Sequence, residues 1–142
     1  MQNTFIERAQ HARARVLAAK SGKEADKYLT AVVRLPAEIR LVGLGQALAI
    51  LLSRSDGRKA DQDGLRRLYD DIEDWMLDAS PNKIREAPQK TPRLLQAIID
   101  GENDRYRLMV AEVDGYLAVL KRLAEIFLSN EGEPDRAGAG AI

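Results

Sequence analysis

The side chains in this sequence that could support acid–base or metal chemistry are a single histidine and one cluster of carboxylates. His11 is the only histidine, and cysteine is absent, which excludes a metal site built on two histidines, a cysteine zinc site and a cysteine nucleophile. The cluster consists of Asp70, Asp71, Asp74 and Asp78. Their oxygens could bind a divalent cation, but neither an EF-hand pattern nor other ligand types accompany them. We therefore interpret the cluster as a solvated or interface face, and we expect no metal and no cofactor.

No other motif supplies a catalytic set. Gly43-Leu44-Gly45 lacks the third glycine and the preceding strand of a dinucleotide-binding site. Because nucleophile, base and metal ligands do not converge on one motif, we expect that the protein is not an enzyme. One alternative stays open, a metal-dependent nuclease that would need Asp70 and Asp74.

The remaining chemistry is recognition by basic side chains. The chain has 22 Lys and Arg against 22 Asp and Glu, which argues against a generally basic nucleic-acid binder. The charges are nevertheless segregated: residues 1–40 hold eight cations and four acids, and residues 54–80 hold five and eight. Such segregation favours opposed basic and acidic surfaces, although ordinary solvated helix surface would give the same pattern.

The element that must organise these side chains is the apolar stretch from Leu35 to Leu52. Between Ile39 and Leu52 only Arg40 and Gln46 are strongly polar, and the run is shorter than the roughly 20 residues of a membrane span. It predicts a helix enclosed by others, with a core centred on three leucines, Leu44, Leu48 and Leu51. Pro36 suits a first helical position, so we expect the preceding helix to end at Leu35. We expect Gly43 and Gly45 to be sites where another backbone packs closely.

Helical spacing elsewhere predicts the other elements. A capping box at Thr4-Phe5-Ile6-Glu7 opens a first helix, with Phe5, Ala9, Ala12 and Val16 facing the core. Further helices are expected at 24–34, at about 61–79, from Pro92 to Gly101, and in a last, most regular helix whose core-facing positions are Tyr106, Val110, Val113, Leu117, Leu120, Ala124 and Phe127. A turn is expected at Asp56-Gly57 and an irregular, basic loop at 80–92.

These patterns predict an all-α fold, a compact single-domain bundle of five to six helices. We expect residues 1–128 to form the domain and residues 129–142 to be a disordered tail, because the tail has almost nothing to bury. The first fifteen residues lack the apolar core of a secretory signal, and cysteine is absent. We therefore expect a cytoplasmic protein.

The apolar stretch also carries a family resemblance. Its order of Leu35-Pro36, Ile39-Arg40, Gly43-Leu44 and Gln46-Ala47-Leu48-Ala49 resembles the signature of the small α-helical subunit of the type III-B CRISPR effector, the Cmr complex. The family typically has Asn and Phe where this sequence has Val42 and Ile50. Tyr69 to Trp75 looks like a further counterpart, and the last helix is similar to the family's closing motif in Gly115-Tyr116-Leu117, Leu120-Lys121-Arg122 and Ala124-Glu125. The resemblance covers residues 5 to 128.

This resemblance implies a non-catalytic subunit of an RNA-guided, RNA-targeting effector in antiviral defence. Small subunits of this family stack along the effector and line the groove that holds the guide RNA and its target. The implied partners are other Cmr subunits, further copies of the chain, CRISPR RNA and target RNA, with no membrane. The implied RNA-binding residues, which would contact phosphates, are Arg8, Arg15, Lys20, Arg34, Arg40, Lys121 and Arg122. Two alternatives remain, the small subunit of the related type III-A effector and a self-associating helical adaptor that binds no nucleic acid.

Overall fold

The computed structural model describes residues 4–55 and 63–129, and this part of the chain contains six α-helices, one short π-helix and no strand. The elements in chain order are α1 (Thr4–Ser21), α2 (Ala25–Val42), α3 (Leu44–Arg54), α4 (Gly64–Asp74), η1 (Trp75–Ala79), α5 (Arg93–Asp100) and α6 (Asn103–Leu128). The all-α fold predicted from the sequence is confirmed. The predicted turn at Asp56-Gly57 lies outside the described residues, as do residues 130–142 of the predicted tail 129–142. The proposed domain boundary therefore stays a prediction.

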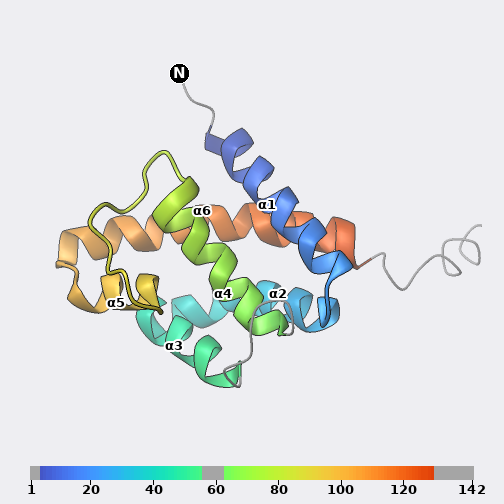
Figure 1. The fold of residues 1–142 in the computed structure, drawn as a ribbon, viewed down its shortest axis with the longest axis horizontal. Helices are drawn as coiled ribbons and strands as arrows, with labels where there is room; N and C mark the ends of the chain where they lie inside the picture. The colour runs from blue at the N-terminus through green and yellow to red at the C-terminus, as the bar shows by residue number, and fades with distance from the viewer. Residues whose placement is uncertain (1–3, 56–62, 130–142) are drawn as a thin grey trace, which may run out of the picture.

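The long helix α6 is the element on which the bundle is built. It crosses the whole molecule in Figure 1, and α1 and α2 both pack along it. Four of its predicted core positions are buried, namely Val113, Leu117, Leu120 and Ala124, and the other three pack against the core while half-buried. The seam predicted for the last helix is therefore confirmed.

The predicted central helix is divided between two elements, so its predicted start was wrong. α2 continues through Pro36 and ends at Val42, and Gly43 then separates it from α3. Proline removes one intrahelical hydrogen bond, but Leu35 before it is buried and Ile39 after it packs against the core, so both halves of α2 lie on the same core. The break falls at Gly43 because its φ of 91° and ψ of 158° are accessible essentially to glycine alone.

The prediction that the core centres on Leu44, Leu48 and Leu51 is confirmed, but the prediction that other helices enclose the whole apolar stretch from Leu35 to Leu52 is wrong. Leu44 and Leu48 are fully buried and Leu51 is 6% exposed. Leu41, in contrast, is 84% exposed. Phe5 was also expected to face the core and is 58% exposed; it lies one turn before Ala9, which does pack on the core.

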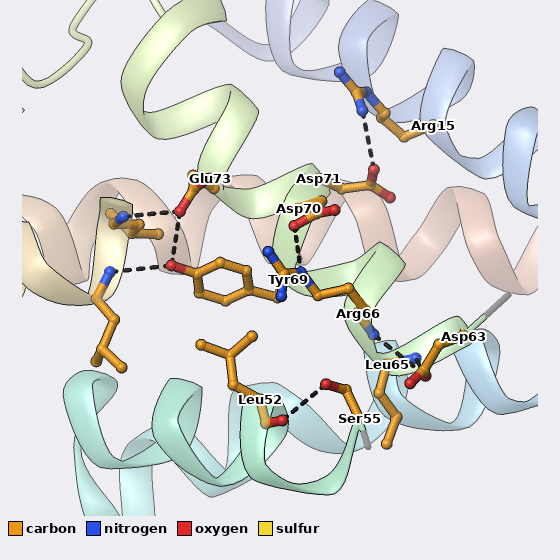
Figure 2. Close-up of polar contacts among 12 residues, drawn as sticks. Arg15, Leu52, Ser55, Asp63, Leu65, Arg66, Tyr69, Asp70, Asp71 and Glu73 are labelled. Carbon is orange, nitrogen blue, oxygen red and sulfur yellow. Dashed lines mark hydrogen bonds and ion pairs between the residues drawn. The ribbon is translucent and has the colours of Figure 1, made fainter. Parts of the chain in front are cut away.

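Helix α5 is attached to α4 through its own N-terminus. The first N–H groups of a helix have no partner inside the helix, and here α4 supplies the acceptors. The Glu73 carboxylate accepts from the Leu94 N–H at 2.8 Å, and the Tyr69 hydroxyl accepts from the Leu95 N–H at 3.1 Å (Figure 2). Tyr69 in turn donates to Glu73 at 2.7 Å. Two of these bonds attach the backbone of the short helix to α4, and its buried side chains, Leu94, Ala97 and Ile98, add to this attachment.

Candidate functional site

Three of the seven predicted RNA-binding residues lie together in a groove between α2 and α6. The groove has a volume of about 320 Å³ and is lined from α2 by Val33, Pro36, Ala37 and Arg40, and from α6 by Asp114, Ala118, Lys121, Arg122 and Glu125. Residues three, four and seven apart share a face of a helix, which is why the two rows meet. The packing of α2 on α6 thus brings Arg40 beside Lys121 and Arg122.

The cations of this groove, which we call the α2–α6 groove, are available for an external anion. Arg40 and Arg122 are exposed and Lys121 is half-buried. Within residues 4–55 and 63–129, Arg40, Lys121 and Arg122 take part in no ion pair, because the salt bridges there involve other cations. Two carboxylates, Asp114 and Glu125, also line the groove, so its cations outnumber its acids by one. An arrangement of this kind can contact phosphate without reading a base.

Two further predicted residues lie away from this groove. Arg34 is exposed and lines a separate hollow of about 330 Å³ on the side of α2 that faces α3, together with Lys27 and Arg54. Lys20 is exposed in the last turn of α1. The structure therefore does not bring Arg34 or Lys20 together with the cations of the α2–α6 groove.

The last two predicted residues, Arg8 and Arg15, form ion pairs with buried or half-buried carboxylates of the same chain. Arg8 contacts Glu112 of α6 at 3.1 Å. Arg15 contacts Asp71 at 3.3 Å and Asp74 at 2.7 Å (Figure 2 shows the pair with Asp71). Both arginines hold α1 against the rest of the bundle.

The interpretation of the aspartate cluster as a solvated or interface face is wrong for Asp71, whereas Asp70, Asp74 and Asp78 keep partly exposed side chains. Asp71 is 2% exposed, and the Tyr28 hydroxyl donates to it at 2.6 Å. Burial raises the pKa of Asp71 to about 6, against the opposing effects of the Tyr28 hydrogen bond and of Arg15. Asp70 and Asp78 pair with Arg66 and Arg93. The burial of Asp71 was missed because its partners, Arg15 and Tyr28, lie on other helices.

His11 lies in a polar chain that the sequence analysis missed. Its Nε2 is 2.7 Å from Asp74 Oδ2, and its Nδ1 is 2.6 Å from the Tyr116 hydroxyl. Because a carboxylate only accepts, Nε2 carries the hydrogen and Nδ1 accepts from Tyr116. Burial lowers the pKa of His11, which favours this neutral form. One pattern in the sequence could have indicated these contacts. His11 and Arg15 are four apart on one helix, and Asp71 and Asp74, which they contact, are three apart on another.

The order carboxylate, imidazole, hydroxyl is also that of a catalytic triad, but the geometry here is that of a packed interior. Tyr116 is fully buried, and its ring stacks on Trp75 at 5.2 Å with 10° between the planes. Burial raises the pKa of Tyr116 well above its ordinary value, whereas an activated nucleophile needs a lowered one. The hydrogen bonds that link Asp74, His11 and Tyr116 therefore fix the positions of α1, α4 and α6 relative to one another.

Across the described ranges, no group of three or more His, Asp or Glu side chains is placed to hold a metal ion. Among the same residues, no helix combines the length and the apolar character needed to cross a bilayer.

Comparison with known proteins matches this chain both to a protein family and to solved structures. The family model described as CRISPR-associated protein (Cas_Cmr5) matches residues 6–127. The fold is similar to the crystal structure of a CRISPR-associated Cmr5 family protein from Thermus thermophilus, with a TM-score of 0.68 and 25% sequence identity, covering 90% of this chain and 99% of that chain. Among curated proteins, none matches significantly. Both the extent and the identity of the resemblance seen in the sequence are thereby confirmed.

Proposed function

Because this chain belongs to the Cmr5 family of CRISPR-associated proteins, the small α-helical subunit of the type III-B Cmr effector, we propose that it is a non-catalytic subunit that contacts RNA backbone inside that effector. Its other partners would be Cmr subunits and further copies of itself. The α2–α6 groove would contact the guide RNA or the target strand through Arg40, Lys121 and Arg122. The proposed setting is the cytoplasm, where the effector meets foreign RNA.

The observation that carries this proposal is the convergence of three cations without acidic partners in the described part of the chain, contributed by two helices that are distant in sequence. Neutralising phosphates releases the counterions around RNA, which favours binding regardless of sequence. An effector must accept any guide, so contacts blind to the base are the suitable kind. The carboxylates of Asp114 and Glu125 keep each contact weak, which fits a subunit that is one of several along the RNA.

The remaining predicted residues take different parts in the proposal. Arg34 and Lys20 are exposed on other surfaces and would serve as additional phosphate contacts outside the groove. Arg8 and Arg15 are already paired with carboxylates, and we expect their main effect on RNA binding to be indirect, through the position of α1.

The absence of catalysis is likewise a proposal, supported by the state of the ionisable groups. The single histidine is engaged on both ring nitrogens, and Asp70 and Asp74, which the nuclease alternative needs, are in ion pairs. A nuclease would have to break these pairs to bind a metal.

We also propose contacts between copies, and the ion pairs within the chain limit which acidic residues can test them. Reversing the charge of Asp71 or Asp74 would break contacts within the chain, so a loss of assembly would not identify an interface. Asp78 is the most exposed member of the aspartate cluster, with 54% of its side chain accessible. It is the member best placed to meet a neighbouring subunit.

The RNA proposal is tested by a salt titration of reconstituted effector complexes. We expect the triple variant Arg40→Ala, Lys121→Ala, Arg122→Ala to assemble normally and to bind target RNA more weakly. The slope of log affinity against log salt should fall by about 0.7 for each phosphate that the variant no longer neutralises, on every guide.

The matched control removes three exposed cations elsewhere, Arg13→Ala, Lys90→Ala and Arg107→Ala. It should leave both affinity and slope close to those of the wild type. If the groove variant behaves like this control while assembly is intact, the groove does not contact RNA, and the protein is an adaptor that holds other subunits.

A further inference from the structure

A second groove, larger than the first, lies between the segment after α4 and the first half of α6. Its volume is about 830 Å³. It is lined by Met76 of η1, by the loop residues Asn82, Lys83, Ile84, Arg85 and Glu86, by Arg8 of α1, and by Arg105, Leu108, Met109, Ala111 and Glu112 of α6. We call it the η1–α6 groove. Nothing in the proposed RNA contact uses it.

The apolar part of this groove is made of flexible and aliphatic side chains. Met76 and Met109 are buried, Ile84 is half-buried, and Leu108 is 73% exposed. Methionine adapts its shape to a partner and is common at protein-binding surfaces. No aromatic residue lines the groove, so it offers no ring on which an unpaired base could stack. The lining therefore favours a protein segment over single-stranded RNA.

The charged part of this groove is basic and largely unpaired. Lys83, Arg85 and Arg105 have no acidic partner in the described part of the chain; Arg105 donates only to the Arg85 carbonyl, at 2.7 Å. Of the two carboxylates, Glu112 is already engaged by Arg8 and by the indole N–H of Trp75 at 2.9 Å. Glu86 alone remains to offset three cations.

The two grooves lie on different sides of α6. The residues of α6 that line one groove lie between 105 and 112, and those that line the other lie between 114 and 125. At 100° per residue their mean directions around the helix differ by roughly 130°. One RNA backbone lying in the α2–α6 groove would therefore not run on into the η1–α6 groove. The second groove calls for a separate occupant.

We infer that the η1–α6 groove is a docking site for a segment of another effector subunit that carries both apolar and acidic side chains. Its apolar side chains would pack on Leu108, Ile84 and Met109. Its carboxylates would pair with Lys83, Arg85 and Arg105, giving the complementary charge that sets the register of a protein contact. The inference uses the membership of a multi-subunit effector but not the RNA contact of the α2–α6 groove.

The test measures binding of the full chain to each purified effector subunit, one at a time and without RNA. We expect one subunit to bind the wild type. Leu108→Gln changes an exposed side chain and should weaken that binding by about fivefold or more, as loss of an interface anchor does. The variant Lys83→Glu, Arg85→Glu should weaken it at least as much, with the larger loss at low salt.

The triple variant of the α2–α6 groove serves as the control and should bind the same subunit normally, so that failure of one proposal does not imply failure of the other. Three results would overturn the inference. They are a wild type that binds no subunit without RNA, groove variants that bind every subunit as the wild type does, and a Lys83→Glu, Arg85→Glu variant that loses affinity for RNA alone.

Discussion

Asp71 is a buried carboxylate whose partners come from two other helices, Tyr28 of α2 and Arg15 of α1. Burial raises the pKa of Asp71 to about 6, from 3.8 in the absence of the fold, while Arg15 and Arg67 partly oppose the rise. The folded protein therefore binds a proton more readily than the unfolded chain between about pH 4 and pH 6. In this window the contribution of Asp71 to stability falls as the pH rises.

The substitution Asp71→Asn removes this titration and keeps an oxygen that can accept from Tyr28. We expect the free energy of unfolding of the wild type, measured relative to the variant, to be larger at pH 4.5 than at pH 7. The full shift in the pKa of Asp71 corresponds to a change in the free energy of unfolding on the order of 2–3 kcal/mol. His11 is present in both proteins, so its own titration largely cancels. Urea unfolding at several pH values measures the difference; a difference that stays constant with pH would show that Asp71 is ionised in the fold throughout.

Gly43 is the residue that decides where one helix stops and the next begins. The Leu44 N–H, the first of α3, donates to the Tyr106 hydroxyl of α6 at 3.0 Å, so the junction is tied to the long helix. The sequence placed the break at Pro36 because proline and glycine both interrupt helices, and local patterns do not rank them. Burial of Leu35 and its neighbours on α2, which is a tertiary effect, decided in favour of Gly43.

The neighbouring glycines give a matched pair of substitutions. Gly43→Ala forces a side chain into a conformation that L-residues rarely adopt, and we expect it to lower the free energy of unfolding by about 1–3 kcal/mol. Gly45→Ala lies inside α3, where the added Cβ would meet Ile98 Cγ2 at 3.4 Å. Its gain in helix propensity of up to about 1 kcal/mol should leave stability unchanged or higher. Equal destabilisation of both variants in denaturant unfolding would contradict the assignment of Gly43 as the break.

Over the whole molecule, features set by local periodicity could be predicted from the sequence, whereas features set by tertiary pairing could not. The faces of α6 were predictable because each core position is set by its own helix. The pairs Arg8–Glu112 and Arg15–Asp71 join residues 104 and 56 positions apart, and no local pattern distinguishes such paired arginines from free ones. The sequence therefore offered Arg40, Lys121 and Arg122 as candidates along with four other cations, and only the packing of α2 on α6 separates the three that converge.

The proposed function depends above all on these three cations facing RNA in the assembled effector. The most direct measurement places a photoreactive phenylalanine derivative at position 122, in the α2–α6 groove, and at position 99, where Ile99 is 70% exposed on α5. Both proteins are reconstituted into the effector with labelled guide RNA and target RNA and are then irradiated. We predict crosslinks from position 122 to one of the two RNAs and none from position 99. Crosslinks from position 122 only to protein, in complexes that still bind target, would contradict the proposed RNA contact.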